Sequence, residues 1–181
     1  MKTFKYQESL EEVFANGALT GLVTFVMSCL TILYWKRDGF DFLEISFMSI
    51  IAGIYLFIII IPMNIIFLNR GIRYGLKNDL PILKRVYQVL LSLIIGMAVF
   101  LLLDSIYFLV DNSISKDFAQ SLKEMSEANG RQLAGIEEFA SLPFGVQNGI
   151  LTFVLGLLGS FISLAFIKRD GQLIKNQYLS V

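Results

Sequence analysis

Long apolar runs limit what this chain can fold into. They cover residues Asn16–Trp35, Ile45–Leu68, Val86–Val110 and Phe144–Ile167. About 20 apolar residues cross the hydrocarbon core of a bilayer as an α-helix, and each run reaches that length. Lipid offers no partner to backbone N–H and C=O groups, so each run should be α-helical. The sequence therefore predicts an all-α polytopic membrane protein with four transmembrane helices in an antiparallel bundle.

The composition agrees with a membrane location and with a single domain. Of the 181 residues, 55% are hydrophobic and 17% are charged, whereas soluble domains average about 45–50% apolar and about 25% charged residues. We predict one membrane domain over residues 1–181. It includes a basic cytoplasmic connection at 69–85 and an extracytoplasmic helical loop at 111–143.

The basic connection predicts the orientation of the bundle. It holds one acidic residue and several cations, which are Arg70, Arg73, Lys77, Lys84 and Arg85. Cytoplasmic loops of membrane proteins are enriched in Lys and Arg, so this connection and both termini should be cytoplasmic. Apolar residues alternate with these cations, which predicts a segment in the interface that attracts anionic lipid headgroups at about 1 kcal/mol per cation. A cytoplasmic docking site is the alternative.

Small residues recur at steps of three and four along the first and last runs. They are Gly17, Gly21, Thr24 and Ser28 in the first run, and Gly145, Gly149, Thr152, Gly156, Gly159 and Ser163 in the last. Membrane helices associate where small residues let their backbones approach closely. We predict that these two stripes pack against each other and close the bundle. The alternative is that one stripe forms an oligomer contact.

A few polar residues interrupt the spans and are candidates for function. Asp104 lies toward the outer end of the third run, and Glu44 lies at the outer start of the second. Ionisable residues inside a membrane often mark ion or proton sites, so this pair is a candidate proton or cation site. The alternative for Asp104 is a carboxylate that reaches headgroup water or bonds a neighbouring span. Pro62 predicts a helix kink, and Asn64 could satisfy the freed backbone or reach another helix.

The loop at 111–143 has two apolar faces at helical spacing, which predict two short amphipathic helices. The first face consists of Ile114, Phe118, Leu122 and Met125, and the second of Leu133, Ile136 and Phe139. These helices should cap the bundle, lie on the outer leaflet or bind a partner. As the longest segment outside the membrane, the loop is the best candidate for partner recognition.

The residue inventory argues against an enzyme. The chain has no histidine and a single cysteine, Cys29, so the usual general base and a thiolate metal cluster are both missing. No phosphate-binding glycine loop or nucleophile motif occurs. We therefore expect no cofactor and no metal site. Fifteen basic and fifteen acidic residues cancel, which gives no reason to expect a nucleic-acid partner.

Two long stretches of the chain resemble a known family. They are "LLSLIIGMAVFLLLDSIYFLVDNSISKDF" and "GVQNGILTFVLGLLGSFISLAFIKRDG", and the first span "GALTGLVTFVMSCLTILYW" also fits. The pattern resembles the domain-of-unknown-function family numbered 4199, although "NDLPILKRVYQ" replaces the glycine-rich approach to span three found in that family. The resemblance implies a small four-span protein of the bacterial plasma (inner) membrane, with a charged helical outer segment and no established activity.

Two classes of function remain. The first is a non-catalytic subunit, scaffold or accessory factor that forms a homo- or hetero-oligomer in the bilayer through its small-residue faces and the 111–143 loop. The second is a small oligomeric transporter or channel that uses Asp104, with Glu44, as a proton or cation site.

Overall fold

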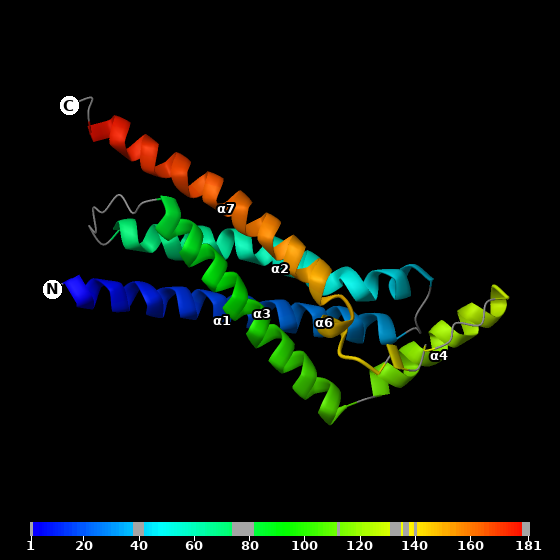
Figure 1. Ribbon diagram of the computed structural model, residues 1–181. Helices are drawn as coiled ribbons and strands as arrows, with labels where there is room; N and C mark the ends of the chain where they lie inside the picture. Colours follow the sequence, from blue (N-terminus) through cyan, green and yellow to red (C-terminus); the bar gives the residue numbers. More distant parts are fainter. Residues whose placement is uncertain are drawn as a thin grey trace.

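The fold is seen in a computed structural model that describes residues 2–37, 42–73, 82–111, 113–130, 135, 138–139 and 141–178. The described part of the chain consists of helices joined by turns and short irregular segments (Figure 1). Its helices are α1 (Lys2–Lys36), α2 (Phe42–Arg73), α3 (Ile82–Val110), α4 (Ser113–Ala128), α6 (Phe144–Gln147) and α7 (Gly149–Tyr178).

Four of these helices contain segments long and apolar enough to cross a membrane. The segments are Leu10–Lys36, Ile50–Phe67, Leu83–Val110 and Gly149–Phe166. The prediction of an all-α multi-pass protein is confirmed. Some helices are longer than their apolar segments. α1 begins well before Leu10, α2 extends beyond both ends of Ile50–Phe67, and α7 continues well beyond Phe166.

Successive spans run in opposite directions, as predicted. Figure 1 shows the N- and C-terminal ends of the chain at the same end of the bundle, and α4 at the other. We call these the terminal end and the cap end. That the terminal end faces the cytoplasm stays a prediction.

The most extensive helix contacts are between α1 and α3 and between α2 and α7, and further contacts join α1 to α2 and α3 to α7. Because directions alternate along the chain, α1 and α3 are parallel neighbours, and so are α2 and α7. Short connections favour antiparallel neighbours, so each of these parallel pairs must be specified by its packing.

The stripe on α1 packs against α3. An ideal Cβ built on Gly17 would lie 2.6 Å from the backbone oxygen of Ser92, and one built on Gly21 would overlap the backbone oxygen of Gly96. Only hydrogen atoms on the glycine α-carbons let the two backbones approach this closely. The α1 stripe is therefore an intramolecular contact between parallel spans.

The stripe on α7 packs against α2 and α3. An ideal Cβ at Gly159 would lie 2.9 Å from the backbone oxygen of Phe57 in α2. One at Gly156 would lie 2.5 Å from Leu93 in α3 and 2.9 Å from Leu56 in α2. Gly149 differs, since no described atom of another element lies within 4 Å of its ideal Cβ.

The prediction that the two stripes pack against each other is therefore wrong. At these glycines, α1 contacts α3 and α7 contacts α2 and α3. Small residues indicate that a helix face is closely packed, but they do not identify the partner helix. An oligomer contact at Gly17, Gly21, Gly156 or Gly159 would compete with these contacts, so oligomers would have to use another surface.

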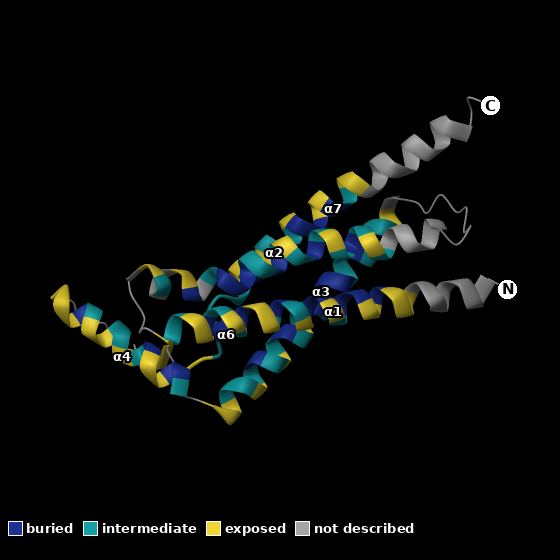
Figure 2. Ribbon diagram, turned by 180° about the vertical axis from the view of Figure 1, so that it is seen from behind, coloured by how far each residue is buried: buried dark blue, intermediate teal, exposed yellow. Residues whose placement is uncertain are grey.

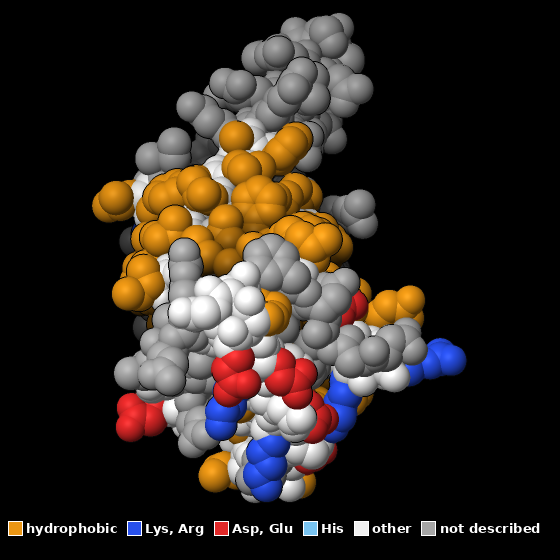
Figure 3. All heavy atoms as spheres, turned by 90° about the vertical axis from the view of Figure 1, so that its right-hand side faces the viewer, with side chains coloured by type: hydrophobic (Ala, Val, Ile, Leu, Met, Phe, Trp, Pro, Cys, Tyr) orange, Lys and Arg blue, Asp and Glu red, His pale blue; other side chains and the backbone are white. Residues whose placement is uncertain are grey.

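Large apolar side chains fill the middle of the bundle and coat its outside. Leu56, Ile60 and Leu93 are 0% exposed and form one core cluster. Apolar residues exposed on the spans include Leu102 and Ile150, which are 61% and 84% exposed. Figure 3 shows apolar side chains over the body of the molecule and charged groups gathered over the cap end. This distribution suits a bundle that is surrounded by lipid.

Helix α4 caps the bundle through the apolar face predicted from its sequence. Ile114 and Phe118 are 1% and 2% exposed and pack against Ile32, Met48 and Phe144. The rings of Phe118 and Phe144 meet edge to face with centroids 5.6 Å apart. The second predicted amphipathic helix lies mostly outside the described residues, including Leu133 and Ile136.

Polar contacts fix the first turn of α4. Lys36 at the end of α1 forms a salt bridge with Asp117 at 3.0 Å and donates a hydrogen bond to Ser113 Oγ at 2.8 Å. The Ser113 N–H donates to the Asp111 carboxylate at 2.9 Å, and this bond lowers the pKa of Asp111. The start of α4 is thereby tied to α1 and to the residue that follows α3.

Candidate functional site

A layer of buried polar side chains crosses the bundle toward its terminal end. All four spans contribute to it, and every member is at most 3% exposed. The members are Asn16 and Thr20 in α1, Asn64 in α2, Ser92 in α3, and Ser160 and Ser163 in α7. We call this group the polar layer. Burying amide and hydroxyl groups in a membrane is unfavourable unless they are hydrogen-bonded.

A chain of hydrogen bonds joins three helices within the polar layer. Asn16 Nδ2 donates to Asn64 Oδ1 at 2.8 Å, and Asn64 Nδ2 donates to Ser163 Oγ at 3.1 Å. The Ser163 hydroxyl in turn donates to the backbone oxygen of Ser160 at 2.6 Å. Of the two roles considered for Asn64, the structure shows contact with other helices. α2 continues through Pro62 to Arg73, and a kink there stays a prediction.

Several oxygens of the polar layer lack a hydrogen-bond partner among the described residues. They are Asn16 Oδ1, Thr20 Oγ1, Ser92 Oγ and Ser160 Oγ. An unsatisfied buried polar group costs about 1–3 kcal/mol, and each such group in a native structure calls for an explanation. Neutral oxygens of this kind suit a water molecule or a small cation.

Sequence analysis found only part of the polar layer. It singled out Asn64 as a kink residue and Ser163 as a packing residue. It missed Asn16, Thr20, Ser92 and Ser160. One signal was present, since polar side chains recur every four residues along α1 at 16, 20, 24 and 28. The hydroxyl groups of Thr24 and Ser28 form their hydrogen bonds within α1, because each donates to the backbone carbonyl four residues earlier at 2.8 Å.

Asp104 lies near the cap end of α3 and is bonded to the start of the last span. Its side chain is 5% exposed, and its Oδ2 accepts a hydrogen bond from the Gly145 N–H at 2.8 Å. An ideal Cβ on Gly145 would lie 2.5 Å from Phe100, so glycine is needed for this approach. The bond joins α3 to α6, the short helix that leads into α7. The alternative to an ion site was a carboxylate that reaches headgroup water or bonds a side chain of a neighbouring span, whereas the structure shows a bond from a backbone N–H.

Among the other predicted site residues, Gly145 bonds Asp104 through its backbone N–H. Glu44 lies half-buried in the first turn of α2, and its pairing with Asp104 stays a prediction. In the described parts of the chain, no three His, Cys, Asp or Glu residues are placed to hold a metal ion.

Within the basic connection, the structure describes only the two ends, residues 69–73 and 82–85. Arg70 and Arg73 belong to the last turns of α2, and Lys84 and Arg85 to the first turn of α3. Lys77 lies outside the described residues. Contact of these cations with lipid headgroups therefore stays a prediction.

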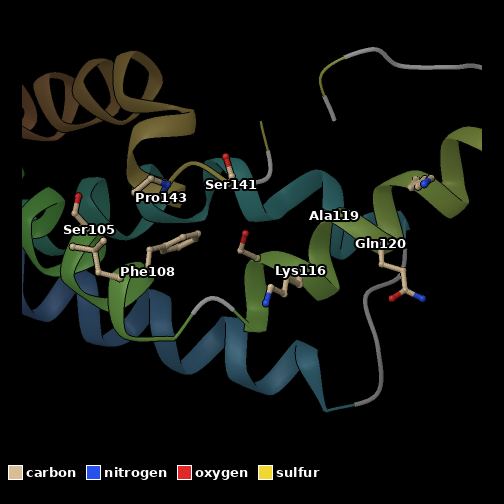
Figure 4. Close-up of a pocket in the computed structure, with 10 residues that line it drawn as sticks. Ser105, Phe108, Lys116, Ala119, Gln120, Ser141 and Pro143 are labelled. Atoms are coloured by element: carbon tan, nitrogen blue, oxygen red, sulfur yellow. The ribbon is translucent and has the colours of Figure 1, made fainter. Parts of the chain in front are cut away.

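A cleft of about 790 Å³ opens at the cap end between α3, α4 and the segment before α6 (Figure 4). Its lining residues are Ser105, Phe108, Leu109, Ser115, Lys116, Ala119, Gln120, Lys123, Ser141 and Pro143. The cleft could not be read from the sequence, because its walls come from three separate segments. We call it the cap cleft.

Comparison with family models, with curated proteins and with solved structures found no match. The resemblance to family 4199 therefore stays a prediction.

Proposed function

We propose that this chain is a non-catalytic multi-pass membrane protein that serves as a subunit, scaffold or accessory factor of a membrane assembly. The closely packed interior of the bundle carries this proposal. Between the polar layer and Asp104, the space is filled by Leu56, Leu93 and Phe100, each at most 1% exposed. The glycine contacts bring helix backbones together on both sides of this core. Such a bundle is suited to holding a recognition element in place.

The recognition element in this proposal is α4. Its first turns are anchored by Ile114 and Phe118, whereas its later turns carry exposed charges, including Glu124 and Glu127. In Figure 1 this later half projects beyond the bundle, and Figure 2 shows it mostly exposed or intermediate. A fixed, charged helix at the membrane surface supports binding to a partner outside the bilayer.

The proposal is tested by gentle detergent purification with mass analysis of co-eluting proteins. We expect a stoichiometric foreign subunit with the wild type, and its loss when Glu124→Lys and Glu127→Lys reverse the charge on α4. As a matched control, Glu11→Lys and Glu12→Lys place the same change on exposed residues nearer the terminal end and should retain the subunit. A pure homo-oligomer, or loss of the subunit in both variants, would contradict the proposal.

The anchoring of α4 leads to a separate prediction. Replacing Phe118 by alanine removes a ring that is 2% exposed, and truncations of buried Phe typically cost about 3–5 kcal/mol. We expect faster hydrogen exchange throughout Ser113–Ala128, with exchange in the spans unchanged. Glu127→Ala on the exposed side of α4 is the control and should leave exchange as in the wild type. Exchange that rises equally in all helices would show that α4 is not a separate unit.

The transporter or channel remains a second candidate because specific observations favour it. A carboxylate is buried at the cap end of the third span, and the polar layer contains oxygens that find no partner among the residues the structure describes. Intramembrane ionisable residues often mark ion or proton pathways.

Two substitutions at Asp104 separate these candidates. Asp104→Asn removes the charge but keeps an oxygen that can accept the Gly145 N–H bond, so stability should change little. Asp104→Leu removes the acceptor as well and should destabilise the bundle by about 1–3 kcal/mol. If the protein transports protons or cations, Asp104→Asn abolishes flux into proteoliposomes while the bundle stays folded. Wild-type liposomes with no flux above empty liposomes would exclude this candidate.

A further inference from the structure

We propose that the cap cleft binds the phosphate head of an anionic phospholipid from the membrane leaflet at the cap end. This inference is independent of the partner proposed for α4. It rests on the chemistry of the cleft walls, on their position relative to the bilayer, and on the charges that surround them.

One wall of the cleft is a polar and cationic stripe on α4. Lys116, Gln120 and Lys123 recur at steps of four and three, so they share one face of the helix, and all three line the cleft. Figure 4 shows Lys116 and Gln120 on the α4 side, with Phe108 and Ser105 of α3 across from them. Ammonium groups separated by two helical turns can contact different oxygens of one phosphate head.

The opposite wall is apolar and belongs to a membrane span. Phe108 and Leu109 lie in the last turn of the segment Leu83–Val110. Leu109 is 87% exposed, so its side chain faces the surrounding lipid. The cleft therefore lies where hydrocarbon gives way to headgroups, with an apolar wall for acyl chains and a cationic wall for a phosphate.

Two lysines and no acidic residue are among the described residues that line the cleft. Asp117 is paired with Lys36 at 3.0 Å, and Glu124 accepts a hydrogen bond from Gln120 Nε2 at 2.9 Å. Within the described part of the chain, neither Lys116 nor Lys123 forms an ion pair. A cationic cleft at this depth favours an anionic amphiphile over a zwitterionic one.

The test measures lipid binding to the purified protein by native mass spectrometry. We expect phosphatidylglycerol to bind and to be retained in preference to phosphatidylcholine. In the variant Lys116→Gln/Lys123→Gln, the affinity for phosphatidylglycerol should fall roughly tenfold or more, since each cation near a membrane surface contributes substantially to such binding. Lys116→Arg/Lys123→Arg keeps both charges and should bind as the wild type. Arg37→Gln removes an exposed cation that does not line the cleft and should also bind as the wild type.

Two further arms distinguish a lipid from a free phosphate. Glycerol 1-phosphate carries the head group without acyl chains and should fail to displace the lipid. Leu109→Asn changes only the exposed apolar wall and should weaken phosphatidylglycerol binding. If glycerol phosphate competes as well as the lipid, or if Leu109→Asn has no effect, the ligand is not a lipid. Equal binding of phosphatidylglycerol by the wild type and the double glutamine variant, with both folded by circular dichroism, would overturn the site itself.

Discussion

Replacement of Gly21 by leucine is expected to separate α1 from α3 and to destabilise the protein more than any other change considered for the spans. An ideal Cβ at Gly21 already overlaps the backbone oxygen of Gly96, and a backbone atom cannot move aside as a flexible side chain can. Overpacked cores typically lose about 1–3 kcal/mol, and leucine adds a whole side chain here. The free energy of unfolding, measured by reversible denaturation in mixed micelles, should fall by at least that amount.

Alanine substitutions at two glycines provide the matched comparison. Gly21→Ala adds one methyl group at the contact with α3 and should still destabilise the bundle. Gly149→Ala adds the same group where nothing lies within 4 Å, and glycine is a poorer helix former than alanine by roughly 0.5–1 kcal/mol. It should therefore be neutral or slightly stabilising. Equal effects at the two positions would mean that the close contact between α1 and α3 does not exist.

Replacement of Asn64 by leucine is the second large expected effect. Asn64 is 0% exposed and bonds both Asn16 and Ser163. Leucine would leave the Asn16 amide without an acceptor in a buried site, which costs about 1–3 kcal/mol. We expect a lower free energy of unfolding with the helix content of the folded state unchanged. Ser28→Ala, which removes a hydroxyl bonded only within α1, should change stability little.

A double-mutant cycle isolates the bond between Asn16 and Asn64. Once Asn64 is leucine, Asn16→Leu removes a group that has already lost its acceptor, so it should cost less than in the wild type. Couplings of side-chain hydrogen bonds between membrane helices average about 0.6 kcal/mol and reach about 1.7 kcal/mol. Additive effects of the two substitutions would refute a direct bond between these side chains.

The spans were predictable because their length and hydropathy are local properties of the sequence. The apolar face of α4 was predictable for the same reason, since Ile114 and Phe118 follow helical spacing and are buried in the structure. The structure shows this face packed against the bundle, which is one of the three roles considered for it, whereas contact with the outer leaflet and recognition of a partner stay predictions.

The choice of neighbouring helices was not predictable from these local patterns. A glycine such as Gly21 marks a face that tolerates close contact, but each span in a ring of four has two neighbours. The polar layer was missed for a related reason. Asn16 and Ser163 are ordinary polar residues near the ends of apolar runs, and only the packing of their helices brings them to Asn64. The bond from Gly145 to Asp104 uses a backbone N–H, which no residue pattern reveals.

The pairing of α1 with α3 and of α2 with α7 has a consequence for biosynthesis. The first helical hairpin leaves the ribosome with the glycine face of α1 unpaired, and the helices that pack most extensively against α1 and α2 are made only with the second hairpin. The four-helix bundle can therefore fold completely only after the final span is inserted. A chain that stops before residue 149 would be a substrate for quality-control proteolysis. By the same reasoning, two separately expressed hairpins should associate in the bilayer and form the complete four-helix bundle.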